Sequence, residues 1–362
     1  MGKGMNEGIA SQCMESCVAE NKAQENHHFP GEPDGNCKTE LCRALRCDEV
    51  PCQFREQFIM TGYRRPYTSA YQCIRSAFMA RNETMNFWTH FIPFLLFLVR
   101  FSVLFTREPF DPYTYPLLSF AIGICGFLLM SSGAHLFNSM SPRKRHVCFF
   151  CDYSAISVYS VGAGMAFYSY GRPVYDGNKG FNFFSPGIYL TGSILVSFIS
   201  TYFCCASRHR WAKMKYVIRT GCFVLAFFFN CSPYLYRVAV EGIDSIDPLA
   251  WSYFKRHSVF YLIAALANTS RMPERLMPGV FDIIGHSHNF LHVFTALGVS
   301  DQFTAMEIEM RHRRPSLEHL GDSFLSRKSL ILMILVSFAN ILIVIWFAKG
   351  LRSDKEEEKK EL

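Results

Sequence analysis

The sequence lacks the marks of several large functional classes. It contains neither a glycine-rich loop that could cradle a phosphate nor the sharp turn that presents a serine nucleophile in hydrolases. Its first 47 residues are polar and hold no apolar signal-peptide core, so we expect no cleaved leader and a largely disordered start. The net charge of +7 comes mainly from loops and tails, and nothing indicates nucleic-acid binding.

Charge is also scarce within eight long apolar stretches, each close to the roughly 20 residues that a membrane-spanning helix needs. The stretches are 87–105, 116–137, 148–170, 185–205, 220–240, 252–268, 286–303 and 329–347. The last is the clearest, because no charge follows until Lys349. Half of all residues are hydrophobic, and 35 are Phe. We therefore predict an all-α integral membrane protein: a seven-helix bundle with an eighth, C-terminal transmembrane helix.

The basic residues of the short loops predict the orientation of these helices. The segments on the N-terminal side of the bundle carry 14 Lys and Arg, against 5 on the opposite side, which indicates a cytoplasmic N-terminus. This count leaves out the loop after the seventh stretch, which carries five basic and four acidic residues and is ambiguous. The predicted organisation is a cytoplasmic N-terminal region at 1–76, a seven-helix core at 77–304 and a connecting loop at 305–328. The eighth helix follows at 329–348, and a charged cytoplasmic tail at 349–362.

The tail also bears on localisation. It ends in Lys359-Lys360-Glu361-Leu362, and a Lys-Lys-x-x end on a cytosolic tail resembles a signal that returns membrane proteins to the endoplasmic reticulum. The alternative is a solvated charged end without a receptor, since charge runs are often only that. We expect a multi-pass protein of the plasma membrane, the endoplasmic reticulum or both.

Side chains that can bind metals interrupt the apolar stretches. His288 and His292 are four residues apart, so on a helix they project from one face, and Ser131 and His135 share this spacing. The predicted orientation brings the three histidines and Asp152 to one depth near the cytoplasmic side. Ionisable groups inside a membrane usually mark functional sites. We therefore predict a divalent metal site, with Zn²⁺ as the first ion to consider.

Two further histidines allow different interpretations. His286 lies two residues before His288 and would face about 160° away from it on a helix, which favours a place at the membrane interface over a ligand role. His90 lies at the cytoplasmic end of the first predicted span. It could join the polar cluster, although single polar residues near span ends are commonly interfacial.

Several motifs in a fixed order resemble those of the progestin and adipoQ receptor (PAQR) family. The resemblance covers about residues 48–304, and its details are most like the membrane progestin receptor branch of the family. The motifs are Asn82-Glu83-Thr84-Met85-Asn86-Phe87-Trp88-Thr89-His90, Ser131 with His135, Asp152-Tyr153-Ser154, Pro273-Glu274-Arg275, and His288 with His292. Branch-like segments are Cys47-Asp48-Glu49-Val50-Pro51, Gly62-Tyr63-Arg64-Arg65 and Gly285-His286-Ser287-His288.

The resemblance implies a specific chemistry for these residues. His135, His288 and His292 would bind Zn²⁺ and leave a fourth position for water, an arrangement typical of catalytic rather than structural zinc. Asp152 would hydrogen-bond that water or act as a general base, and Ser131 would contact the water or a substrate carbonyl.

Three functions stay open at this stage. The first is a receptor for a steroid such as a progestogen or for a related lipid, acting through heterotrimeric G proteins. The second is a zinc-dependent hydrolase of lipid amides, similar to ceramidases. The third is a structural zinc that only ties two helices together. The partners expected are a steroid or other lipid, the surrounding membrane lipids and a G protein.

Overall fold

The computed structural model describes residues 43–108, 111–173, 185–208, 211–317 and 323–351. Lys359 and Lys360, and the N-terminal start that we expect to be disordered, lie outside these residues. Within the described part the chain is helical, without a named strand. This agrees with the all-α class predicted from the apolar stretches.

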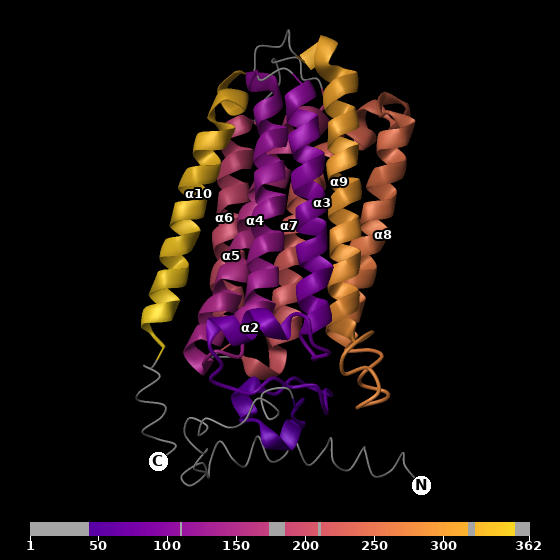
Figure 1. The fold of residues 1–362 in the computed structure, drawn as a ribbon. Coiled ribbons are helices and arrows are strands. Elements are labelled where there is room, and N and C mark those ends of the chain that lie inside the picture. Colours follow the sequence, from indigo (N-terminus) through magenta and orange to yellow (C-terminus); the bar gives the residue numbers. More distant parts are fainter. Residues whose placement is uncertain (1–42, 109–110, 174–184, 209–210, 318–322, 352–362) are drawn as a thin grey trace.

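Eight long helices form an upright bundle in which consecutive helices run in opposite directions (Figure 1). They are α3 (Thr84–Arg107), α4 (Tyr115–Phe137), α5 (Pro142–Ala166), α6 (Pro186–Ser207), α7 (Lys215–Glu241), α8 (Pro248–Ser270), α9 (Ser287–Leu317) and α10 (Ser323–Lys349). A π-helical turn, η5 (Phe167–Gly171), extends α5. The short elements are η2 (Cys47–Glu49), η3 (Cys52–Phe54), α2 (Ala70–Ser76), η4 (Pro112–Thr114), η6 (Ala212–Met214) and η7 (Ile243–Ser245).

Local sequence explains where several helices begin. Pro142 and Pro248 occupy first-turn positions, where the missing amide hydrogen costs nothing and the fixed φ suits a helix. The Ser141 side chain accepts a hydrogen bond from the Lys144 amide, and the Asp247 carboxylate accepts one from the Leu249 amide. These N-caps satisfy amides that have no partner inside the helix.

Six of the described helices are long and apolar enough to cross a membrane: α3, α4, α5, α6, α7 and α10. α8 and α9 do not meet this criterion, although both stand in the bundle and pack against each other along their length. Both helices carry charged side chains, and some of these are paired with each other: Arg256 on α8 donates to Asp301 on α9. An integral membrane protein is thus supported, and the count of eight spans stays a proposal.

The segment predicted as a connecting loop, 305–328, is largely helical in the structure. α9 continues to Leu317, and α10 already begins at Ser323. The reason is pairing: Arg237 on α7 donates to the buried Glu309 at 2.6 Å, and Arg313 donates to the Tyr170 carbonyl oxygen at 2.6 Å. These charged side chains turn inward and hold the helix against its neighbours.

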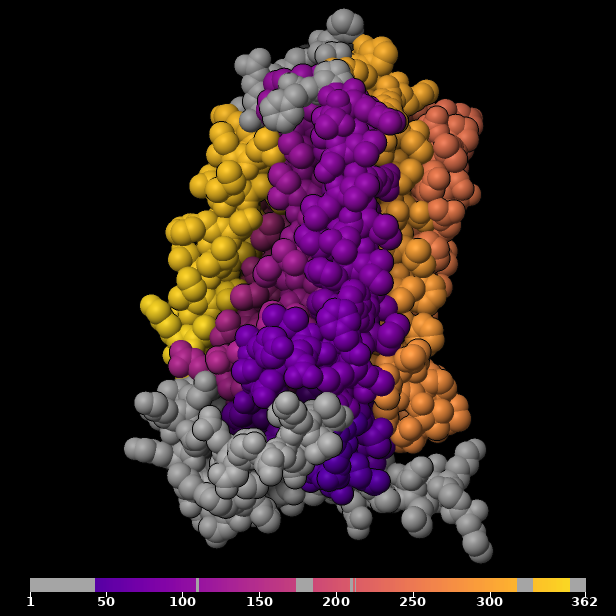
Figure 2. Space-filling model, in the orientation of Figure 1, coloured from indigo at the N-terminus to yellow at the C-terminus, as the bar shows by residue number. Residues whose placement is uncertain are grey.

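Residues 43–76, which we call the cap, fold across the end of the bundle where α3 begins and α10 ends (Figures 1 and 2). The cap has its own small apolar core around Val50 and Ile59. Several bonds fasten it; among them, Arg64 donates to the His135 carbonyl oxygen at 2.7 Å, and the Thr61 amide donates to Asp282 at 2.7 Å. The cap therefore closes the bundle beside the predicted metal ligands.

The eighth helix is packed rather than peripheral. α10 lies along α5, α4 and α6 on one side of the bundle (Figure 2). Its buried Asn340 bonds Thr201 at 2.5 Å and Ser197 at 3.2 Å, both on α6. A Cβ on Gly123 of α4 would lie 3.6 Å from the Met333 side chain, an ordinary contact distance, so α10 packs directly on α4.

Candidate metal centre

The structure brings His135, His288 and His292 together at the cap end of the bundle. His135 lies in the last turn of α4, and the other two lie in the first turns of α9. One potential ligand atom of each lies within 4.8 Å of the others, and the Nε2 atoms of His135 and His288 are 3.1 Å apart. Such a nitrogen pair is favourable only with a proton or a cation between its lone pairs.

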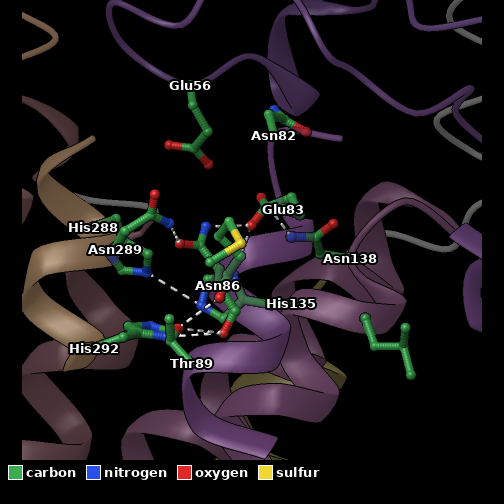
Figure 3. Close-up of polar contacts among 12 residues, drawn as sticks. Glu56, Asn82, Glu83, Asn86, Thr89, His135, Asn138, His288, Asn289 and His292 are labelled. Carbon is green, nitrogen blue, oxygen red and sulfur yellow. Dashed lines mark hydrogen bonds and ion pairs between the residues drawn. The ribbon is translucent and has the colours of Figure 1, made fainter. Parts of the chain in front are cut away.

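Neighbouring groups fix the orientation of two of these rings (Figure 3). The Nδ1 atom of His135 lies 2.7 Å from Glu83, and that of His292 lies 3.0 Å from the Asn86 carbonyl oxygen. Both partners only accept, so both Nδ1 atoms must donate, which leaves Nε2 with its lone pair. This is the arrangement in which histidines bind metals, with the outer nitrogen held by a carboxylate or carbonyl. The donor set fits zinc.

Glu83 is the centre of the polar contacts around His135. Its carboxylate also accepts from the side-chain amides of Asn86 and Asn138, each at 2.8 Å. Burial by itself raises the pKa of this carboxyl, but His135, Arg145 and Arg64 together hold it well below its ordinary value. Glu83 therefore stays ionised, which favours a cation bound beside the His135 ring.

Asp152 and Ser131, the predicted catalytic pair, line the same cavity as the three histidines. The Ser131 hydroxyl lies beside the Asp152 carboxylate. Oδ1 of Asp152 is buried and has no hydrogen-bond partner among the described residues. A buried carboxylate oxygen without a donor is costly, so this atom is free to accept a bond from a bound molecule.

His90 and His286 both belong to the cluster. The His90 ring stacks on the His292 ring with centroids 3.8 Å apart, and neither His90 nitrogen has a hydrogen-bond partner in the described chain. His286 also lines the cavity and is only 4% exposed, so it is buried within the protein beside the three predicted ligands. It precedes α9 and follows Gly285, whose φ of +86° turns the chain, so the helical angle does not apply.

One continuous cavity of about 620 Å³ connects this cluster with the interior of the bundle. Its wall is mainly apolar and aromatic, and includes Phe127 and Phe227. Phe228 of α7 and Leu262 of α8 line it although each is 59% exposed on the outside of the bundle. The cavity therefore opens sideways between α7 and α8, toward the lipid that would surround the helices.

Basic side chains line the cap end of the cavity, among them Lys215 and Arg271. Glu56 of the cap also lies there and pairs with Arg145. Burial raises the pKa of Glu56, but Arg145 and Lys215 outweigh it and keep this pKa below its ordinary value. The cap thus closes the polar end of the cavity through an ion pair.

Sequence reasoning missed several residues of the site: Glu83, Asn86, Arg64 and Glu56. Glu83 and Asn86 stand in the quoted motif of residues 82–90, so their position was visible while their role was not. Arg64 likewise stands in a quoted motif. Glu56 carries no signal in the sequence, because its contact with Arg145 spans 89 positions of the chain.

Comparison with known proteins defines the family. The haemolysin-III-related family matches residues 78–303, which include every predicted metal ligand and Asp152. The chain belongs to this family, which includes the progestin and adipoQ receptors. Human membrane progestin receptor delta is 36% identical over 321 residues, covering 86% of this chain and 92% of the relative.

The matches to two further relatives from this group also span most of each relative's length. Human membrane progestin receptor gamma is 35% identical over 331 residues, covering 89% of this chain and 98% of the relative. Human membrane progestin receptor beta is 31% identical over 275 residues, covering 74% of this chain and 76% of the relative. The PAQR resemblance seen in the sequence is thereby confirmed, and the chain is a multi-pass membrane protein of this receptor family.

Proposed function

We propose that the protein is a receptor for a steroid, such as a progestogen, or for a related lipid. The observation that carries the proposal is the cavity of about 620 Å³, which has aromatic walls, a lateral opening between α7 and α8, and a polar end at the histidine cluster. Cavities of this size and character suit small apolar ligands. The names of the relatives point to progestins as the ligand class.

His135, His288 and His292 would hold Zn²⁺ at the polar end of this cavity. Zinc bound there would supply Lewis acidity and lower the pKa of a bound water to about 7. Glu83 and Asn86 would keep the rings in the ligating orientation. Asp152 would hold or accept a proton at its free Oδ1, and Ser131 would orient a ligand carbonyl or that carboxylate.

A zinc-dependent lipid amide hydrolase is the second candidate. It is favoured by Asp152, because a buried carboxylate oxygen without a hydrogen-bond partner, in the same cavity as three metal ligands, is more than a structural tie requires. The third candidate is a structural zinc alone, which would join α4 to α9 through His135 and the other two ligands.

The remaining proposals concern orientation and partners. With a cytoplasmic N-terminus, the cap and the histidine cluster would face the cytosol, where a heterotrimeric G protein is the proposed partner. The protein would reside in the plasma membrane, the endoplasmic reticulum or both, depending on whether Lys359 and Lys360 act as a retrieval signal.

The test uses the full-length protein purified without chelators and placed in lipid nanodiscs. Zinc content, progesterone binding and release of fatty acid from ceramide are measured for the wild type, Asp152→Asn and Asp282→Asn. Asp282 is a matched control because it is a buried carboxylate that fastens the cap instead of facing the cavity.

The receptor proposal expects one zinc per chain and progesterone binding that Asp152→Asn leaves largely intact. If Asp152→Asn instead keeps zinc and abolishes ceramide cleavage, the hydrolase is correct. Absence of stoichiometric metal from the wild type would reject every version with zinc, and absence of progesterone binding would reject the steroid receptor.

A further inference from the structure

A second polar group lies in the cavity, deeper in the bundle than the histidine cluster. Tyr159 of α5, Tyr261 of α8 and Gln302 of α9 all line the cavity. Tyr159 donates to the Gln302 side-chain oxygen. The Tyr261 hydroxyl lies 2.7 Å from the Tyr159 oxygen and 3.2 Å from the same Gln302 oxygen, so its single hydrogen is given to one of these two acceptors. We call these three residues the distal pole.

The distal pole keeps one donor unused. Both tyrosine hydrogens are used within the group, because Tyr159 donates to Gln302 Oε1 and Tyr261 donates to Tyr159 or to that same oxygen. The Gln302 side-chain nitrogen donates no hydrogen bond to any described residue, and the side chain is only 2% exposed to the outside. An N–H group without an acceptor in an apolar cavity costs folding free energy. The hydrogen bonds that join α5, α8 and α9 here do not use this N–H group.

The two polar ends of the cavity are separated by an apolar wall. Asp152 and Tyr159 are seven residues apart on α5, which corresponds to about 10 Å along the helix axis. His292 and Gln302 are ten residues apart on α9, which corresponds to about 15 Å. Phe127, Phe227 and Ile156 line the same cavity. A matching ligand is therefore a long, stiff apolar body with a polar group at each end.

We propose that the distal pole is a second recognition site, which selects a rigid lipid carrying an acceptor oxygen at each end. One oxygen would lie at the histidine cluster, and the other would accept the free N–H of Gln302. This inference rests on the proposed receptor function and narrows its ligand. A steroid with ketones at both ends of the ring system fits, whereas a lipid with one polar head would place its apolar chain against the distal pole.

The test compares three probes on the full-length protein in nanodiscs: progesterone, its analogue without the C3 ketone and its analogue without the C20 ketone. Gln302→Leu removes the donor at nearly constant size. The control is Ser300→Ala, which removes a hydroxyl from the same helix at a position that does not line the cavity. Gln302→Leu also removes the acceptor of the tyrosine hydroxyls and could destabilise the fold. The triple variant Tyr159→Phe/Tyr261→Phe/Gln302→Leu is therefore measured as well, because replacing all partners by apolar groups can be nearly neutral for folding.

Gln302→Leu and the triple variant should bind progesterone roughly three- to tenfold more weakly, the loss expected for one neutral hydrogen bond. They should bind one of the two single-ketone analogues as the wild type does, and Ser300→Ala should bind all three unchanged. Equal losses for all three probes would show a structural role and overturn the inference, as would no loss at all. If the wild type binds no progesterone, the receptor proposal fails first and the distal pole loses its ligand with it.

Discussion

Glu83→Gln is the sharpest perturbation of the metal centre, because it changes one atom and no ligand. In the structure one carboxylate oxygen accepts from His135 Nδ1 at 2.7 Å and from Asn86 at 2.8 Å, and the other accepts from Asn138 at 2.8 Å. A glutamine can direct its oxygen to only one side. If it keeps His135, its NH₂ faces the NH₂ of Asn138, which cannot turn because Arg64 occupies its oxygen at 2.5 Å.

Two effects of known size follow from this geometry. Loss of a charged partner behind a metal ligand typically lowers metal affinity by about 10- to 100-fold. The opposed NH₂ groups leave a buried donor without an acceptor, which costs about 1–3 kcal/mol of folding free energy. Glu83→Gln should therefore still bind zinc at saturation, but with weaker affinity and a lower melting temperature.

The assay is competition between the purified protein in nanodiscs and a chelator of known zinc affinity, with thermal unfolding measured with and without zinc. Glu274→Gln is the matched control. Glu274 is fully buried and accepts from the Ser287 amide at 2.7 Å, next to His288, yet it touches no metal ligand. It should lower stability and leave zinc affinity unchanged. Wild-type zinc affinity in Glu83→Gln, or an equal loss in both variants, would refute the reasoning.

The other predictions concern the ligands, the cap, the topology and the tail. His288→Ala should remove zinc and lower the melting temperature, because one of the ties from α9 to His135 is lost; unchanged zinc content would contradict this. The folded-state pKa of Glu56 is depressed, so its carboxylate stabilises the fold at neutral pH and loses this contribution as the pH falls below the unfolded-state value of about 4.3. Glu56→Gln should therefore lower the free energy of unfolding at neutral pH and reduce the further decrease below about pH 4.3. An N-terminal tag should stain only permeabilised cells. Lys359→Ser/Lys360→Ser should raise surface levels, and no change would remove the retrieval signal.

The helices and the histidine cluster could be predicted because their signals are local. Long apolar runs reveal helices by length alone, and the four-residue spacing of His288 and His292 fixes one shared face. Alternation of helix direction then places His135 at the same end of the bundle. No three-dimensional information is needed for these steps, so the trio meets as the spacing indicates.

The partners of these ligands could not be predicted, because they depend on contacts between distant segments. His135 receives its orientation from Glu83, 52 residues earlier, and its carbonyl oxygen is bound by Arg64, 71 residues earlier. The burial of His286 could not be predicted for a related reason: it lies before the first residue of α9, next to the turn at Gly285, so the helical angle to His288 does not apply. Spacing rules fail where an element ends.

α8 and α9 are not apolar enough to be recognised as membrane-spanning helices from their composition. The polar residues of α9 indicate why. α9 carries His288, His292 and Gln302 on the side that lines the cavity, and Glu309 where it meets Arg237 of α7. These side chains lower the hydropathy of the helix, yet each is directed inward and does not require exposure to lipid. A helix that supplies both polar ends of a ligand cavity must be less apolar than its neighbours. Weak hydropathy in α9 is therefore a consequence of its place at the site and no argument against its place in the membrane.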